Sequence, residues 1–286
     1  MTRMIRVGYH CHGLDHLEKV IISNGLHRGE FYNFPPEKLP ELKREILRHN
    51  LAVSVHAPLV RAPWYPVPPT LSFLCDVDEE RRQLSQRMIR ETMELAQDFG
   101  AEYVVVHFPA PPSTDVSGVD YARLREVAWQ GAFYLAELSL KHDLPIHIEG
   151  FGPSPFLRVD FLVEVMTNFP CLLYCFDIGH MHLAAQRDSF DLYQFAQQLS
   201  PYIGSIHLWN NRSIEDYFNF RHIPVHPVQK PEDGWVDITR ILQLILPNNP
   251  SCRIIFESGF RYPQALGGHD FRDGVRWVKE LVATLS

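Results

Sequence analysis

The sequence predicts an α/β fold, a (β/α)8 barrel formed by a single domain over residues 1–286. The first observation is that short β-rich runs alternate with helical patterns eight times along the chain. The second is that these runs are continuously apolar, as strands are in a parallel sheet whose faces are covered by helices. The third is length, because eight such units need about 250 residues and the chain has 286.

The expected elements follow one another in a regular order. Strands are predicted at residues 4–10, 30–34, 51–58, 101–108, 144–150, 171–177, 203–209 and 252–258. Helices are predicted after each strand, at residues 14–25, 36–50, 78–100, 120–142, 158–168, 189–200, 236–246 and 270–284. The second helix has proline at its start and asparagine at its end, as helix termini often do. An open doubly wound sheet is the alternative, but "GYHCHG" after the first strand is a poor match to the glycine-rich phosphate motif of that fold.

Two connections are longer than simple turns between elements. One is the proline-rich segment 57–73 and the other is segment 209–235. Long connections in compact domains are usually binding loops or lids. The sequence leaves open whether these two segments close over a site.

The composition is typical of a soluble protein of the cytoplasm. A net charge of −7 gives no overall attraction to nucleic acid or to an anionic membrane. Five cysteines are present and four lie in or beside apolar runs, so free thiols in a reducing compartment are expected. The first residues lack the apolar core of a signal peptide, and no apolar run reaches the roughly 20 residues of a membrane helix. The oligomeric state is left open.

Polar residues stand at the carboxyl ends of the predicted strands, where barrels of this kind build their active sites. The residues at these ends are His10, His12, Glu30, His56, His107, Glu149, Asp177, His207 and Glu257. A single histidine at a strand end is most often structural. Imidazoles and carboxylates that converge from several strands, however, are what a metal ion needs. Asp177 has a second interpretation, as the cap of a following helix.

Four short motifs carry a resemblance to a known family: "IHIEG", "FDIGHMHLA", "SIHLWNNR" and "IIFE". In this order they resemble the xylose isomerase-like TIM barrel superfamily, which includes endonuclease IV and many sugar or sugar-phosphate isomerases and epimerases. The likeness runs from "VGYHCHG" to "IIFES", nearly the whole chain. It implies that Glu149, Asp177, His207 and Glu257 bind a divalent metal ion, with zinc or manganese expected.

Further motifs resemble the endonuclease IV branch of this superfamily. "SVHAP" and "VVHFP" imply that His56 and His107 bind additional zinc ions, and His226 resembles the histidine of that branch's Asp-x-His motif. Two departures weaken this likeness: Pro224 stands in place of the acid, and Leu59 in place of a DNA-contacting tyrosine. One ion is therefore favoured over two or three. A sugar or sugar phosphate is therefore the expected partner, and nucleic acid is the less favoured alternative.

The leading functional hypothesis is an isomerase or epimerase of carbohydrate metabolism that acts on a sugar or sugar phosphate. The resemblance implies that a metal ion stabilises an ene-diolate while Glu149 and Glu257 exchange the proton at the carbon beside the carbonyl. His180 would act beside them, as a catalytic group or as an additional metal ligand.

Other residues are expected to contact the substrate. They are Arg212, whose forked donors suit phosphate, together with Trp64, Trp209 and His10. His182, His222 and His269 are left without a role. The first alternative function is an endonuclease IV-like phosphodiester hydrolase that acts at abasic sites. The second is a non-catalytic ligand-binding barrel, disfavoured because the shared ligands are intact.

Overall fold

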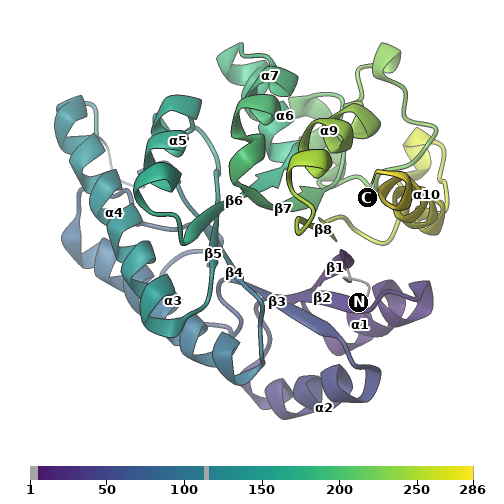
Figure 1. Ribbon diagram of the computed structural model, residues 1–286, viewed down its shortest axis with the longest axis horizontal. Coiled ribbons are helices and arrows are strands. Elements are labelled where there is room, and N and C mark those ends of the chain that lie inside the picture. Colours follow the sequence, from purple (N-terminus) through teal and green to yellow (C-terminus); the bar gives the residue numbers. More distant parts are fainter. Residues whose placement is uncertain (1–5, 113–115, 286) are drawn as a thin grey trace.

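The chain forms a closed barrel of eight parallel strands, which confirms the predicted fold class (Figure 1). The computed structural model describes residues 6–112 and 116–285, so the first two residues predicted for the first strand lie outside the described residues. Each strand pairs with its neighbours in chain order, and β8 closes onto β1. The strands are β1 (Val7–Cys11), β2 (Arg28–Phe31), β3 (Ala52–His56), β4 (Val104–His107), β5 (Ile146–Glu149), β6 (Leu172–Asp177), β7 (Ile203–Leu208) and β8 (Arg253–Phe256).

Helices surround the barrel on its outer face (Figure 1). The α-helices are α1 (Leu14–Val20), α2 (Leu39–His49), α3 (Glu79–Asp98), α4 (Tyr121–His142), α5 (Val159–Asn168), α6 (Ile178–Asp188), α7 (Leu192–Leu199), α8 (Ile214–Phe220), α9 (Ile238–Ile245) and α10 (Phe271–Thr284). Short 3-10 helices are η1 (Ile22–Asn24), η2 (Pro36–Lys38), η3 (Ser200–Tyr202), η4 (Pro231–Asp233), η5 (Leu246–Asn248) and η6 (Gln264–Leu266). In the described residues, no helix is both long enough and apolar enough to cross a membrane.

Two of these helices were not predicted, because their sequences are short or only weakly amphipathic. The sequence placed a single helix after the sixth strand, whereas α6 begins at once and α7 follows it. Helix α8 lies inside the segment predicted to be a long loop. Side chains cap both helices: Asp177 accepts a hydrogen bond from the His180 amide at α6, and Ser213 accepts one from the Asp216 amide at α8. Such caps satisfy amide groups that a helix start leaves free.

The outer helices bury one apolar face against the barrel. Helix α9 shows the pattern, because Ile238, Ile241, Leu242 and Ile245 are all buried. This spacing places the four side chains on one side of a helix with 3.6 residues per turn. The predicted punctuation of the second helix is confirmed, with Pro36 opening η2 and Asn50 ending α2 in a left-handed conformation at φ 49°.

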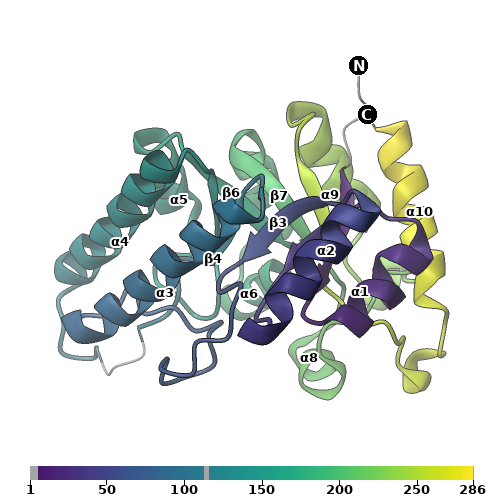
Figure 2. The same ribbon diagram turned by 90° about the horizontal axis from the view of Figure 1, so that it is seen from below.

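Strand register brings the polar strand ends to the same level. His107 pairs with Glu149 across β4 and β5, and Asp177 pairs with His207 across β6 and β7. All eight strands run the same way, so these residues gather at one end of the barrel. Figure 2 shows α8 on that side, below the strands, and the yellow end of α10 on the opposite side.

Candidate metal centre

Four strand-end residues meet at the carboxyl end of the barrel. Glu149, Asp177, His207 and Glu257 each offer one ligand atom, and these atoms all lie within 4.8 Å of one another. His207 Nδ1 is 3.3 Å from Glu149 Oε2, 3.4 Å from Glu257 Oε2 and 3.9 Å from Asp177 Oδ2. Ligands held at roughly 2.0–2.2 Å from one ion come within about 4.4 Å of each other. The measured spacings therefore match four ligands around a single cation.

Unsatisfied polar atoms show that the cluster fits a cation. Glu149 Oε1 and Oε2, His207 Nδ1 and Glu257 Oε2 are buried and have no hydrogen-bond partner among the described residues. Leaving buried polar or charged atoms unpaired is costly, and buried charges are normally paired or bound to metals. Carboxylate and imidazole donors together are a suitable set for zinc or manganese. The four residues thus fit the divalent ion that the resemblance implies.

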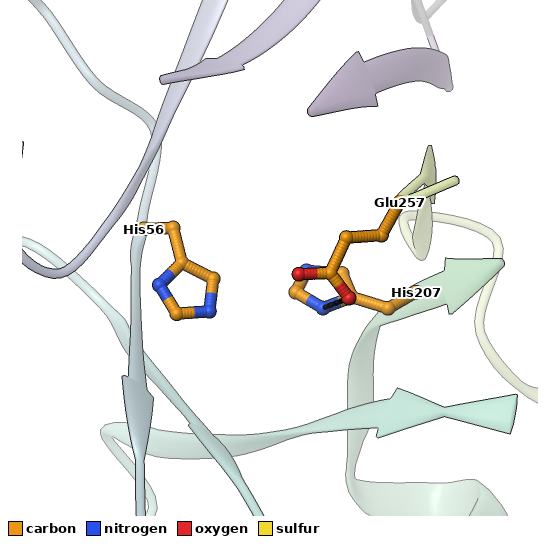
Figure 3. Close-up of side chains that lie close together, drawn as sticks. All are labelled: His56, His207 and Glu257. Carbon is orange, nitrogen blue, oxygen red and sulfur yellow. Dashed lines mark ion pairs between the residues drawn. The ribbon is translucent and has the colours of Figure 1, made fainter. Parts of the chain in front are cut away.

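A second group shares Glu149 with the first. His56 Nε2 lies 3.3 Å and His107 Nε2 lies 3.4 Å from Glu149 Oε2. His56 also forms a group with His207 and Glu257, which Figure 3 shows facing it from the other side of the barrel. The two groups could therefore surround two neighbouring cation positions, with Glu149 common to both.

Hydrogen bonds to backbone carbonyls determine which ring nitrogen of His56 and of His107 carries the proton. His107 Nδ1 bonds the Thr70 carbonyl, and His56 Nδ1 bonds the Ala57 carbonyl at 3.2 Å. A carbonyl oxygen only accepts, so both Nδ1 atoms carry the proton. Each Nε2 is then the nitrogen that faces the Glu149 carboxylate. A cation between them would be bound by Glu149 and by the Nε2 lone pairs of the neutral rings.

Glu30 holds His207 in place, a role that sequence reasoning did not assign. His207 Nε2 donates to Glu30 Oε1 at 2.7 Å, and both side chains are fully buried. Glu30 Oε2 accepts in turn from Tyr103 Oη at 3.1 Å and from Ser54 Oγ at 3.3 Å. With its proton on Nε2, His207 presents the Nδ1 lone pair to the cluster. Such carboxylate partners orient metal-binding histidines and raise their basicity.

Asp177 combines the two roles that the sequence presented as alternatives. Its Oδ1 accepts from the His180 amide at 2.6 Å, which caps α6. Its Oδ2 accepts from Trp209 Nε1 at 2.9 Å and also lies in the four-residue cluster. A helix cap and an indole therefore hold the carboxylate against the cluster, so capping does not compete with a place at the site.

The carboxylates in the cluster affect one another's proton affinity. Burial raises the pKa of Asp177 well above its usual value, and the neighbouring Glu257 and Glu149 carboxylates raise it further. Burial also acts to raise the pKa of Glu149, but the His207 and His107 imidazoles outweigh it and hold that pKa well below its usual value. The cluster therefore contains more carboxylate than its own cationic groups neutralise.

His222, rather than His226, lies beside the cluster. His226, expected as a possible additional metal ligand, lies in none of the ligand groups of the described residues, and its role as a ligand stays a prediction. Its ring stacks on His269 at 4.7 Å, and its Nε2 is 3.8 Å from Asp273. By contrast, His222 Nδ1 is 3.9 Å from Glu257 Oε2 and donates to the Glu257 carbonyl at 2.7 Å. The two histidines are four residues apart in one loop, and the local sequence does not indicate which of them lies beside the cluster.

His180 and His10 lie at the edge of the cluster. The His180 ring is 5.1 Å from Trp209 and 5.3 Å from His222, and burial, with His222 nearby, lowers its pKa to about 3. The His10 ring is 5.6 Å from that of His56, and its buried Nε2 has no partner among the described residues. Both are neutral groups close enough to the site to contact a bound molecule.

The other expected substrate contacts are engaged elsewhere. Arg212 makes two hydrogen bonds to Asp216, at 2.6 and 2.9 Å. Trp64 is half-buried beneath the Arg87 guanidinium of α3, 4.1 Å from its ring. Trp209 is fully buried and stacks on His222 at 4.1 Å, with the Gly179 backbone against its ring. Trp209 therefore holds Asp177 in place through its indole hydrogen bond. A substrate contact by Arg212, Trp64 or Trp209 stays a prediction.

Known proteins with this architecture include both epimerases and nucleases. The family model for the xylose isomerase-like TIM barrel matches residues 11–281. A D-tagatose 3-epimerase-like protein shares 17% identity at a TM-score of 0.74, with 98% of each chain covered. A xylose isomerase-like TIM barrel protein from Mycobacterium smegmatis in complex with magnesium shares 12% at 0.60, also with 98% of each covered. Endonuclease IV from Thermus thermophilus shares 16% at 0.58, with 98% of this chain and 99% of that one covered. No curated protein matches the sequence.

Proposed function

Because this chain belongs to the xylose isomerase-like TIM barrel family, we propose that it is a metal-dependent isomerase or epimerase acting on a sugar or sugar phosphate. The observation that carries the proposal is the cluster of Glu149, Asp177, His207 and Glu257 with its unpaired buried atoms. A divalent ion at this cluster would act as a Lewis acid on a sugar carbonyl and the hydroxyl beside it. The residues around it would then move a proton at carbon.

The two glutamates are the groups best placed to move that proton. Glu149 Oε2 lies 3.3–3.4 Å from nitrogens of His56, His107 and His207 and would bind the ion. Oε1, which accepts no hydrogen bond from the described residues, would then be the oxygen that takes a proton. Glu257 borders a pocket of about 400 Å³, so its carboxylate meets bound substrate from the open side. Proton transfer needs each group within hydrogen-bond reach of the same carbon. Neutral His180 and His10 would bind hydroxyl groups around it.

The proposal predicts metal-dependent exchange of one carbon-bound sugar hydrogen with solvent. In heavy water, incubation of aldoses, ketoses and their phosphates with the protein should introduce deuterium beside the carbonyl, detectable by NMR. Glu257→Gln should lower this exchange by about 100-fold or more, because general acid–base catalysis contributes about 10²–10⁴-fold. Glu94→Gln, an exposed substitution on α3, is the matched control and should exchange at the wild-type rate. No exchange with any sugar would contradict the proposal.

A second candidate function is phosphodiester hydrolysis of the endonuclease IV kind. The group formed by His56, His107 and Glu149 favours it, because two adjacent cation positions suit the attacking and leaving oxygens of a displacement. Duplex DNA is a poor fit, since the net charge is −7 and Leu59 is fully buried and so does not reach a ligand. Cleavage of an abasic-site duplex by the pure protein, lost in Glu149→Gln, would move the assignment to this function.

The two groups predict different affinities for two ions. The four-residue cluster supplies three carboxylates, whereas the second group adds only two imidazoles, which bring no negative charge, and shares Glu149. We expect one ion to survive dialysis and a second to bind only when metal is added. His107→Ala should abolish the second binding event, seen by titration calorimetry, and leave the first ion in place by elemental analysis. Loss of the first ion in this variant would show that the two positions are not separate.

A further inference from the structure

A pocket of about 400 Å³ opens directly beside Glu257, away from the other metal-cluster residues. We propose that it binds the phosphate group of a phosphorylated sugar whose other end lies at the metal cluster. This inference rests on the proposed function and names its substrate class. The volume falls within the range of about 300–1,000 Å³ that is usual for small-molecule sites.

The charges of the pocket favour an anion. Arg221 and Arg261 line it and are exposed, and within residues 6–112 and 116–285 neither makes an ion pair with an acidic group. Each guanidinium instead lies over an aromatic ring, Arg221 over Tyr217 at 5.5 Å and Arg261 over Phe260 at 5.6 Å. Glu257 is the single acidic residue in the lining, and its Oε2 faces His207 in the metal cluster. Two forked donors without carboxylate partners suit a phosphate group.

The pocket also has a strained and well-anchored backbone. Arg221 adopts φ 59° and ψ −136°, a conformation that residues other than glycine rarely take. Its amide donates to the Tyr217 carbonyl at 2.9 Å, and two residues later the Ile223 carbonyl accepts from the Asn210 amide at 2.9 Å. The chain is therefore fixed on both sides of Arg221 and His222. This conformation brings His222 to Glu257 and leaves Arg221 in the pocket lining.

Histidines also line this pocket, and one of them connects it to the metal cluster. His12 and His16 are part of the lining, with ring centroids 4.4 Å apart. His10 reaches from the pocket toward His56, so the same lining connects the arginines with the metal ligands. A compact pocket with one end at the cluster fits a monosaccharide phosphate. The arginine predicted from sequence, Arg212, is instead bound to Asp216.

The test measures phosphate binding and substrate preference in the same variants. Inorganic phosphate is titrated into the protein as purified, by calorimetry, for the wild type, for Arg221→Gln/Arg261→Gln and for Arg44→Gln. Arg44 is an exposed arginine of α2 and gives the same kind of change in charge away from the pocket. Both pocket arginines are exposed, so their replacement removes no core contact. We expect phosphate affinity to fall at least about tenfold in the double variant, because both charged donors to the phosphate are removed.

Deuterium exchange then separates this inference from the proposed reaction. We expect the wild type to exchange the carbon-bound hydrogen of a sugar phosphate with a higher kcat/KM than that of the same sugar without phosphate. The double variant should lose this preference. Equal phosphate affinity in all three proteins, or no phosphate binding by the wild type, would overturn the phosphate site. This holds even if the protein exchanges a sugar hydrogen with solvent. Weakened phosphate binding in the double variant without exchange on any sugar would support the site and contradict the proposed reaction.

Discussion

Glu149→Gln is expected to leave the purified protein almost free of bound metal, whereas the wild type should hold at least one divalent ion per chain. Glu149 Oε2 is close to His56, His107 and His207, and the residue belongs to both cation groups. Glutamine keeps the size of the side chain but removes the negative charge that a divalent ion requires in a buried site. Elemental analysis after equal dialysis measures the difference.

Two further variants make this prediction specific. Glu94→Gln makes the same chemical change on the exposed face of α3 and should keep the wild-type metal content. Glu30→Gln removes the charge behind His207 without removing a ligand, so metal affinity in competition with a chelator should fall roughly 10- to 100-fold. A purely structural role for Glu30 would lower stability and leave metal affinity unchanged. Wild-type metal content in Glu149→Gln would show that the cluster does not hold the ion.

Removal of the ion by a chelator is expected to lower the melting temperature by about 10 °C. Without a cation, the carboxylates of Glu149, Asp177 and Glu257 remain close together at 1%, 0% and 13% exposure. A ligand present at about 1,000 times its Kd stabilises the folded state by roughly 4 kcal/mol. Each kcal/mol corresponds to about 2–4 °C for proteins of roughly this size. Differential scanning calorimetry before and after chelation, with the chelator removed, measures the shift.

The control is the variant that cannot hold the ion. Glu149→Gln should melt at nearly the same temperature with and without chelator, and zinc or manganese added back to the stripped wild type should restore its original value. If chelation shifts the variant as much as the wild type, the stabilising ion lies elsewhere. If neither protein shifts, the buried carboxylates are neutralised by protons rather than by metal.

The barrel was predictable because its signals are local. A buried parallel strand is a short apolar run, and its partner helix repeats apolar residues at 3.6-residue spacing, as α9 does with Ile238, Ile241, Leu242 and Ile245. The placement of Glu149, Asp177, His207 and Glu257 on one rim followed from the same rule, since parallel strands end on one side. Helix α8 escaped prediction because its seven residues carry too little of that periodicity.

Contacts between distant segments could not be predicted in this way. Glu30 and His207 are 177 positions apart, and only closure and stagger of the barrel bring their side chains to 2.7 Å. The choice between His222 and His226 depends on the backbone of the loop, in which Arg221 takes a left-handed φ and directs His222 to Glu257. The sequence by itself therefore determined the strands, the barrel and the chemical types at its rim, because these depend on local pattern. The tertiary structure decided which of those groups meet, because side chains from separate strands and loops are brought together only when the barrel closes.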